Sequence, residues 1–356
     1  MLEIVAILIS FFFAMNIGAS GAAASMGVAY GAGAITRPRN ALILCAIGVI
    51  LGAVIGGGEV VKTISEGIIP SSLITIKIVV IILFSATFSL FLANLLGIPL
   101  STSEVTVGSV VGIGIAHQVL YVNNLLWIVM FWILIPIVAF GIAFFVIKLL
   151  HSFHFTKKYT FEGKVVTIIL IFAGFFEAFS AGMNNVANAV GPLVSANLMT
   201  VSKGTIIGGA FVALGALLLG RRVLETNGKK ITKFTKIEGI LISGTGASLV
   251  TIASIFGIPV PLTQITSSSI LGIGMAKNGS KITFQQRIVK NMLMVWLISP
   301  LISLTLSYFF VKLFIDNDIY TIIVLASLFL ATLGAISLMK ATKQEKRTVH
   351  EEGGGI

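Results

Sequence analysis

Long apolar segments recur along this chain, and they leave very few folds open to it. A transmembrane helix needs about 20 consecutive apolar residues, and runs of roughly that length fill most of the sequence. They fall at 2–34, 40–57, 73–96, 97–116 and 124–148, then at 163–200, 204–220, 238–256, 257–276 and 290–312, with a last run at 319–339. Only 10% of the residues are charged, against about 25% in soluble domains. The sequence therefore predicts an all-α membrane protein with about 11 transmembrane segments.

This composition excludes several classes of protein. Soluble enzymes and nucleic-acid-binding domains have no use for 56% hydrophobic residues, and an outer-membrane barrel would show segments of about ten residues with alternating hydrophobicity. The four His and the single Cys show no metal-ligand spacing. A membrane enzyme acting on a phosphorylated lipid would need a nucleophile with a base, or a metal cluster, and the apolar segments show neither. We expect no catalytic residues, no metal, no bound cofactor and no nucleic-acid partner.

The apolar segments form two matching sets. With an offset of 164, residues 18–27 lie over 182–191, and with an offset of 160, residues 97–116 lie over 257–276, sharing GIP, one Thr and GIG in register. With an offset of 163, EVVKT at 59–63 lies over RVLET at 222–226. Internal duplication of this kind is the usual build of a secondary transporter. A passive channel, which is a further alternative, does not explain the duplication.

The basic residues predict that the two repeats have opposite orientations. Loop 57–72 holds only Lys62, whereas its counterpart at 221–236 holds six basic residues. Cytoplasmic loops carry the excess of Lys and Arg, so equivalent loops lie on opposite sides. An outside N-terminus and a cytoplasmic C-terminus place 20 of the 24 Lys and Arg in the cytoplasm, leaving Lys62, Lys77, Lys203 and Lys312.

The expected organisation is one membrane domain of two inverted-topology repeats with broken helices or hairpins, plus one extra C-terminal helix. The first repeat covers 1–148, a cytoplasmic linker covers 149–163, and the second repeat covers 164–313. Residues 314–356 hold the extra helix and a basic cytoplasmic tail.

Clusters of Gly, Ser and Asn interrupt the longest run of each repeat. The runs 2–34 and 163–200 are too long for one straight helix, so we expect both helices to be broken. Non-helical backbone at membrane depth is tolerated where it lines a cavity or is buried in protein. Asn184, Asn185 and Asn188 favour a polar site, whereas close helix packing is the better explanation of the small residues at 22–25.

A second motif, Gly-Ile-Pro followed by polar side chains, also occurs twice. It contains Ser101, Thr102 and Ser103 in the first repeat, and Thr263 and Gln264 in the second. Gly and Pro end one helix, and the N-terminus of the next offers free N–H groups and the positive end of its dipole. Such an N-terminus binds anions. Simple capping at a kink is the alternative interpretation.

Carboxylates inside apolar segments are functional candidates by default. Glu104 lies within the first hydroxyl motif, and Glu177 lies just before the Asn cluster. A carboxyl group buried away from water favours its protonated form, so either residue could carry a proton. Glu59 and Glu225 stand near basic residues at expected membrane edges, and we expect them to form surface ion pairs.

At these motifs the chain resembles the inorganic phosphate transporter (PiT) family, which has a GANDVANA-type signature and a PVSTTH-type motif in each half. Here the signatures read GASGAAASMG at 18–27 and GMNNVANAVGP at 182–192. The other motifs read PLSTSEVTVG at 99–108 and PVPLTQITSS at 259–268. The resemblance covers nearly the whole chain and implies an oxyanion transporter.

The departures from the family pattern are specific. The signature Asp is Gly21 in the first half and Asn185 in the second, and the motif His is Glu104 and Gln264. Pro261 replaces a motif Ser. The resemblance implies that the missing Asp residues are the sodium ligands, so their loss puts sodium coupling in question.

The same losses bear on the choice of anion. Phosphate keeps a P–OH that wants an acceptor such as a carboxylate, whereas sulfate offers only acceptors. A dry site with donors and no Asp would leave the P–OH unpaired, at a cost of about 1–3 kcal/mol. This pattern is similar to the bacterial sulfate permease (CysP-type) branch of the family, located in the plasma membrane.

The resulting hypothesis is proton-coupled import of sulfate, or a related tetrahedral oxyanion, by alternating access. The proposed donors are hydroxyl and amide side chains: Ser101, Thr102, Ser103, Asn184, Asn185, Asn188 and Thr263, with Gln264 and Ser20 as second choices. Glu104 is the expected coupling acid and Glu177 the runner-up. The alternative is a sodium- or proton-coupled phosphate symporter of the same family. The partners are the anion and the lipid bilayer, and the sequence is compatible with a homodimer without predicting one.

Overall fold

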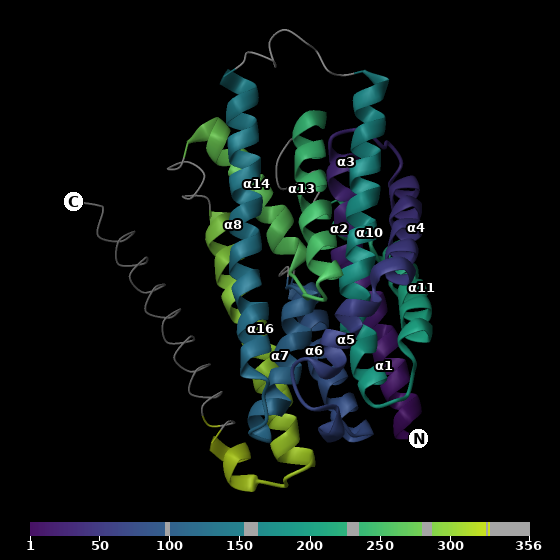
Figure 1. Ribbon diagram of the computed structural model, residues 1–356, viewed down its shortest axis with the longest axis vertical. Coiled ribbons are helices and arrows are strands. Elements are labelled where there is room, and N and C mark those ends of the chain that lie inside the picture. The colour runs from purple at the N-terminus through teal and green to yellow at the C-terminus, as the bar shows by residue number, and fades with distance from the viewer. Residues whose placement is uncertain (97–99, 153–162, 226–234, 280–286, 325–326, 328–356) are drawn as a thin grey trace, which may run out of the picture. The chain divides into compact units, whose positions relative to one another are not determined.

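The structure is a computed structural model that describes residues 1–96, 100–152, 163–225, 235–279, 287–324 and 327 (Figure 1). It divides into two units, Met1–Ser307 and Tyr308–Ile356. Every regular element in these described ranges is helical, as the apolar runs predict. Most of the expected linker at 149–163, most of the extra helix at 319–339 and the basic tail lie outside the described residues.

The helices of the two repeats follow the duplicated order. The first repeat contains α1 (Leu2–Ile17), the π-helical turn η1 (Gly18–Ala22), α2 (Ala23–Ser25), α3 (Gly27–Gly31), α4 (Pro38–Gly56), α5 (Gly58–Glu66), the 3-10 turn η2 (Ser71–Leu73), α6 (Ile76–Leu96), α7 (Thr102–Ala116) and α8 (Val122–Ser152). The second contains α10 (Lys164–Ser195), α11 (Val201–Leu219), α12 (Arg221–Glu225), α13 (Lys236–Ile255), α14 (Leu262–Asn278) and α16 (Arg287–Phe314).

Two hairpins stand within a frame of longer helices. α6 packs on α7, and α13 packs on α14. Figure 1 shows the α6–α7 hairpin in the lower half of the view and the α13–α14 hairpin in the upper half, while α8 and α10 run past both. Seven described helices are long and apolar enough to cross a membrane, and α7 is among the shorter apolar ones. The expected count of eleven crossings is therefore not confirmed, because four of the predicted segments form these two hairpins.

The repeats pack against each other through the same contact made twice. A Cβ atom placed on Gly18 would lie 1.9 Å from the carbonyl oxygen of Val212, and one on Gly182 would lie 2.2 Å from that of Val49. Positions 18 and 182 are equivalent in the repeat, and so are positions 49 and 212. The backbones of α10 and α4 therefore touch as those of η1 and α11 do.

A second reciprocal pair gives the same result. A Cβ on Gly52 would lie 1.8 Å from the carbonyl oxygen of Phe179, and one on Gly215 would lie 2.0 Å from that of Met15. These positions are again equivalent in pairs. Contacts that occur in such exchanged pairs are the mark of an approximate two-fold axis relating the repeats.

Only one of the two expected helix breaks is found. In the first repeat, α1 passes into the π-helical turn at Gly18–Ala22, and the helix is interrupted again at Met26 between α2 and α3. In the second repeat, α10 continues unbroken from Lys164 to Ser195. The prediction of a break in 163–200 is wrong, because the polar side chains of α10 find partners on neighbouring elements while its backbone remains helical.

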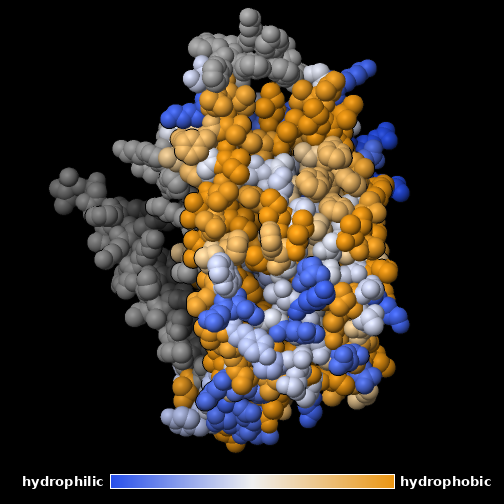
Figure 2. Space-filling model, viewed as in Figure 1, coloured by the Kyte–Doolittle hydropathy of each residue, from blue (hydrophilic) through white to orange (hydrophobic). Residues whose placement is uncertain are grey.

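The outer surface fits a lipid environment. Large apolar side chains stand exposed along α8, among them Leu126, Ile133, Ile137 and Phe145. Figure 2 shows hydrophobic residues over much of this face, with hydrophilic residues gathered in its middle and lower parts. The protein is a multi-pass membrane protein.

Candidate functional site

Asn184 joins α10 to the backbone that connects α13 and α14. Its Nδ2 donates to Ser254 Oγ and to the carbonyl oxygen of Ile258, both at 3.0 Å, and its Oδ1 accepts from the N–H of Val260 at 3.0 Å. The connection begins at Gly257, whose φ of +70° favours glycine. Irregular backbone inside a membrane protein needs polar partners, and the buried Asn184 amide supplies them.

The first turn of α7 meets the same face of α10. Thr102 Oγ1 donates to Asn185 Oδ1 at 3.2 Å, and Ser103 Oγ contacts Asn184 Oδ1 at 3.4 Å. Asn188 Nδ2 lies 3.4 Å from Thr102 Oγ1 and 3.3 Å from Ser103 Oγ. All five side chains are buried. The structure thus brings together two hydroxyls from the first repeat and three amides from the second.

Ser103 also joins the two hairpins. Its Oγ lies 3.1 Å from the carbonyl oxygen of Val260. α7 and the 258–260 backbone therefore meet at the same Asn184 side chain, whose Oδ1 contacts both Ser103 Oγ and the N–H of Val260. The tips of the two hairpins converge at this point of α10.

Two helix N-termini point into this region. The N–H of Glu104 is capped by Ser101 Oγ at 3.4 Å, whereas the N–H groups of Thr102 and Ser103 bond to no described residue. At α14, the N–H groups of the first two residues, Leu262 and Thr263, likewise bond to no described residue. The first N–H groups of a helix have no partner within it, and together with the dipole they favour an anion.

Glu104 and Gln264 meet across the internal symmetry. Gln264 Nε2 donates to Glu104 Oε1, and the two positions differ by the repeat offset of 160. Equivalent positions that touch each other lie at the axis that relates the repeats. Both side chains are buried, and Glu104 Oε2 has no partner among the described residues. The Ser299 hydroxyl faces the same carboxylate.

Glu177 occupies a separate buried position on α10. Its Oε1 accepts from Thr266 Oγ1 of α14 at 2.8 Å, and the hydroxyl of Ser243 on α13 faces it. A Cβ atom on Gly246 would lie 3.2 Å from Glu177 Oε1. Glu177 precedes Asn184 by seven residues, which is two turns or about 10 Å of helix. It is therefore not part of the Asn184 cluster.

Ser20 and Thr263, like Glu177, lie outside the hydrogen-bonded cluster. Ser20 Oγ donates to the carbonyl oxygen of Asn16, 2.8 Å away in its own helix. The half-buried Thr263 side chain makes no hydrogen bond within the described part of the chain. Its backbone N–H at the start of α14, rather than its hydroxyl, is the group that the fold presents.

Other polar groups of the site were not predicted. The partners of Asn184 include Ser254 and the backbone of 258–260, and the two carboxylates face Ser299 and Ser243. Single Ser residues in apolar helices are too common to stand out in a sequence. Only Thr266, inside the second hydroxyl motif, carried a readable signal.

No group of three His, Cys, Asp or Glu side chains occurs within the described ranges. Gly21 lies beside Asn185, since a Cβ atom on Gly21 would be 3.5 Å from Asn185 Nδ2. Hydroxyls, amides and helix N-termini dominate the cluster, with Glu104 as its one carboxylate.

The chain consists of two repeats related by an approximate two-fold axis. Their hairpin tips bring helix N-termini to a buried amide cluster. This architecture defines a secondary transporter of the inverted-repeat class. The chain belongs to the phosphate transporter family, whose model matches it twice, at residues 17–168 and 158–307. Each match covers one repeat.

Two individual proteins sharpen this comparison. The sulfate permease CysP of Bacillus subtilis (strain 168) is 66% identical over 355 residues, which cover 100% of both chains. A solved structure, the sodium-dependent phosphate transporter, is similar with a TM-score of 0.76 and 25% identity, over 88% of this chain and 100% of that one.

Proposed function

We propose that this protein imports sulfate across the bacterial plasma membrane by proton-coupled symport. The observation that carries the proposal is the convergence of two helix N-termini on buried hydroxyls and amides. The full-length identity of 66% to a sulfate permease supports the choice of anion. This function needs binding and movement rather than a reacting group.

The chemistry of the cluster favours a fully deprotonated oxyanion. Thr102, Ser103 and Asn188 can turn donors toward an anion, as can the free N–H groups of α7 and α14. Gly21 and Asn185 stand where the family signature has Asp, so the acceptor that a P–OH requires is missing there. A buried donor without an acceptor costs about 1–3 kcal/mol, which disfavours phosphate against sulfate.

Glu104 is the proposed coupling acid. It is buried in the first turn of α7, and one of its oxygens has no partner among the described residues. Protons that move inward with the dianion reduce the net charge carried, which makes import against the membrane potential less costly. Sodium has no comparable site, since the signature Asp positions hold Gly21 and Asn185.

The hairpins supply the moving parts in this proposal. Each hairpin tip contributes one helix N-terminus, and the tips meet beside Asn184 and Ser103. Rocking of one repeat against the other would open the site to one membrane side at a time. Following the basic loops, we place the N-terminus outside and the C-terminus in the cytoplasm.

The decisive test is uptake of labelled sulfate into proteoliposomes under an inward proton gradient without sodium. Excess unlabelled phosphate is the competitor. We expect gradient-dependent, saturable uptake that phosphate does not inhibit. Uptake that phosphate blocks, or that requires sodium, would favour the phosphate symporter of the same family. Uptake that rises linearly with concentration would favour a passive pore.

A pair of variants tests the coupling assignment. Glu104→Gln keeps the side-chain size and can still pair with Gln264, but it cannot release a proton. We expect it to abolish the pH dependence of uptake while counterflow exchange of sulfate continues. Glu177→Gln is the matched comparison, and it should keep the pH dependence. The reverse pattern would assign coupling to Glu177.

A further inference from the structure

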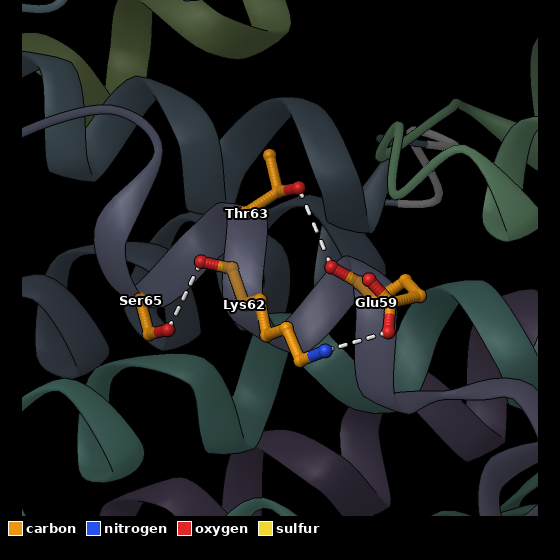
Figure 3. A network of polar contacts seen from close by, with 4 residues as sticks. All are labelled: Glu59, Lys62, Thr63 and Ser65. Atoms are coloured by element: carbon orange, nitrogen blue, oxygen red, sulfur yellow. Dashed lines mark hydrogen bonds and ion pairs between the residues drawn. The ribbon is translucent and has the colours of Figure 1, made fainter.

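A charged helix lies next to the turn that carries the candidate site. Figure 3 shows Glu59 and Lys62 of α5 side by side, with Lys62 Nζ 2.7 Å from Glu59 Oε1. Their side chains are 57% and 61% exposed, respectively. The opposite face of α5 is apolar and buried through Val60, Val61 and Ile64. The predicted ion pair at this position is therefore confirmed, and the packing of α5 holds it outward.

One contact places the beginning of α5 against the α13–α14 turn. A Cβ atom on Gly257 would lie 2.9 Å from Thr63 Oγ1 and 3.1 Å from the carbonyl oxygen of Glu59. Thr63 Oγ1 also reaches that carbonyl, at 3.4 Å. The residue after Gly257 is Ile258, whose carbonyl accepts from Asn184. Only one residue therefore separates the turn held by Asn184 from the backbone that carries the charged pair.

Contacts between α5 and α10 also place α5 close to the candidate site. A Cβ on Gly191 would lie 2.6 Å from Ile64 Cγ2 and 3.7 Å from the carbonyl oxygen of Val61. Gly191 follows Asn188 by three residues, about 4.5 Å along the helix. The first turn of α5 thus begins near the turn of α10 that holds Asn188.

Exposed charges at this level require water. Charged side chains within a membrane protein face the bundle interior or a water-filled space. Figure 2 shows hydrophilic residues in the middle of the face, and α5 lies in this part of the view in Figure 1. The Glu59–Lys62 pair therefore marks a wet approach to the hairpin tips.

We propose that Lys62 is the residue that first captures the oxyanion on this approach, exchanging Glu59 for the incoming anion before it reaches the hairpin tips. In this exchange a sulfate oxygen replaces the Glu59 carboxylate oxygen that pairs with Lys62 Nζ. Glu59 is exposed, so the exchange leaves no unpaired charge in the protein interior. The inference rests on the proposed function and deepens it by naming a specificity-determining residue outside the cluster.

The repeat itself supports this assignment. Position 59 is equivalent to Arg222 and position 62 to Glu225, so the charges are exchanged between α5 and α12. The ion pair on α12 joins Arg221 and Glu225 at 2.9 Å. Lys62 is also one of the four basic residues that the positive-inside rule leaves on the outer side. The entry side thus carries a lysine where the equivalent position of the second repeat carries a glutamate already paired with Arg221.

The test compares variants of full-length protein in proteoliposomes, with labelled sulfate at low ionic strength. Lys62→Met removes the capturing charge, so we expect KM to rise about fivefold with little change in kcat. Glu59→Gln removes the competing carboxylate, so we expect KM to fall about twofold or more. Both effects should shrink at high salt, where exposed charges are screened. Lys62→Arg should stay near the wild type.

The opposite signs separate capture from a structural role. If the pair merely stabilised α5, both variants would change KM in the same direction, which would overturn the inference. Lys77→Met is the matched control, because it removes an exposed lysine from the first turn of α6, and it should leave KM unchanged. A wild type without saturable sulfate uptake would instead overturn the proposed function. Wild-type uptake with an unshifted KM for Lys62→Met would overturn only the role of Lys62.

Discussion

Asn184 is the residue on which the geometry of the site depends. Both ends of its amide are engaged, the Nδ2 by Ser254 and Ile258 and the Oδ1 by Val260 and Ser103. A hydroxyl has only one donor and a carboxylate has none, whereas the Asn184 amide donates twice and accepts at the same side-chain tip. The sequence signalled a polar residue here, whereas the identity of its partners came from the fold.

Asn184→Ala is expected to destabilise the protein and stop uptake. The change leaves the N–H of Val260 and the carbonyl of Ile258 buried without partners, at about 1–3 kcal/mol for each unsatisfied group. Thermal unfolding in detergent should show a clearly lower Tm. Asn124→Ala is the control, since the exposed Asn124 makes one 3.0 Å bond to the Gly67 carbonyl. An equal Tm for the two variants would contradict the role given to Asn184.

Gly21→Asp tests the explanation of anion choice. A Cβ atom on Gly21 has only Asn185 Nδ2 within 4 Å, at 3.5 Å, so the first carbon of a side chain is accommodated in ordinary van der Waals contact. The added carboxylate should repel sulfate and lower its uptake about tenfold, equivalent to about 1.4 kcal/mol. Phosphate should begin to compete, because its P–OH gains an acceptor.

Gly21→Asn is the matched variant without charge. We expect it to keep sulfate uptake and the lack of phosphate competition. Should Gly21→Asn lose uptake as fully as Gly21→Asp does, steric exclusion would explain both results. The missing Asp would then say nothing about the preferred anion.

At the scale of elements, glycine packing holds the repeats together. α4 and α10 approach so closely that a Cβ on Gly52 would overlap the Phe179 carbonyl, 1.8 Å away. Its equivalent, Gly215, stands in the same relation to Met15. Small residues allow such close helix crossings in membranes.

Gly52→Ala and Gly215→Ala should therefore each lower the Tm by a similar amount. Overpacking of this kind typically costs about 1–3 kcal/mol, and here the clash is with backbone. Gly141→Ala in α8 is the control, because a Cβ at Gly141 meets nothing within 4 Å. It should leave the Tm unchanged or raise it slightly. A strong effect of only one of the first two changes would contradict the reciprocal packing.

The sequence predicted the helical class and the duplicated motifs, but not how each motif is used. Helical periodicity and length cannot tell a crossing segment from one arm of a hairpin, since α13 satisfies both descriptions. The Asn cluster suggested a broken helix, yet α10 is continuous. Its Asn184 amide binds Ser254 and the 258–260 backbone, while Asn185 and Asn188 contact Thr102 and Ser103 of α7. These partners lie 70 or more positions away in the chain, and local sequence does not reveal such long-range contacts.

At the scale of the whole molecule, cysteine labelling can determine the orientation of the chain in the membrane. The chain has one cysteine, Cys45, and it is buried, so single introduced cysteines report their own surroundings. Tyr121→Cys should react with an impermeant maleimide in intact cells. Arg39→Cys should react only after the cells are opened. Both positions are exposed, and the inverse result would reverse the assigned topology.

The contact between Glu104 and Gln264 determines how many carboxyl groups lie at the axis between the repeats. In an assembly of two identical halves, a residue at the two-fold axis must face its own copy, as two acids or as two amides. Joining the halves in one polypeptide lets the two positions diverge. One side, Gln264, then donates while the other, Glu104, accepts, and under the proposed coupling each transport unit would keep a single exchangeable proton at this position. The covalent link between the repeats is thus what allows this position to carry one carboxyl group rather than two or none.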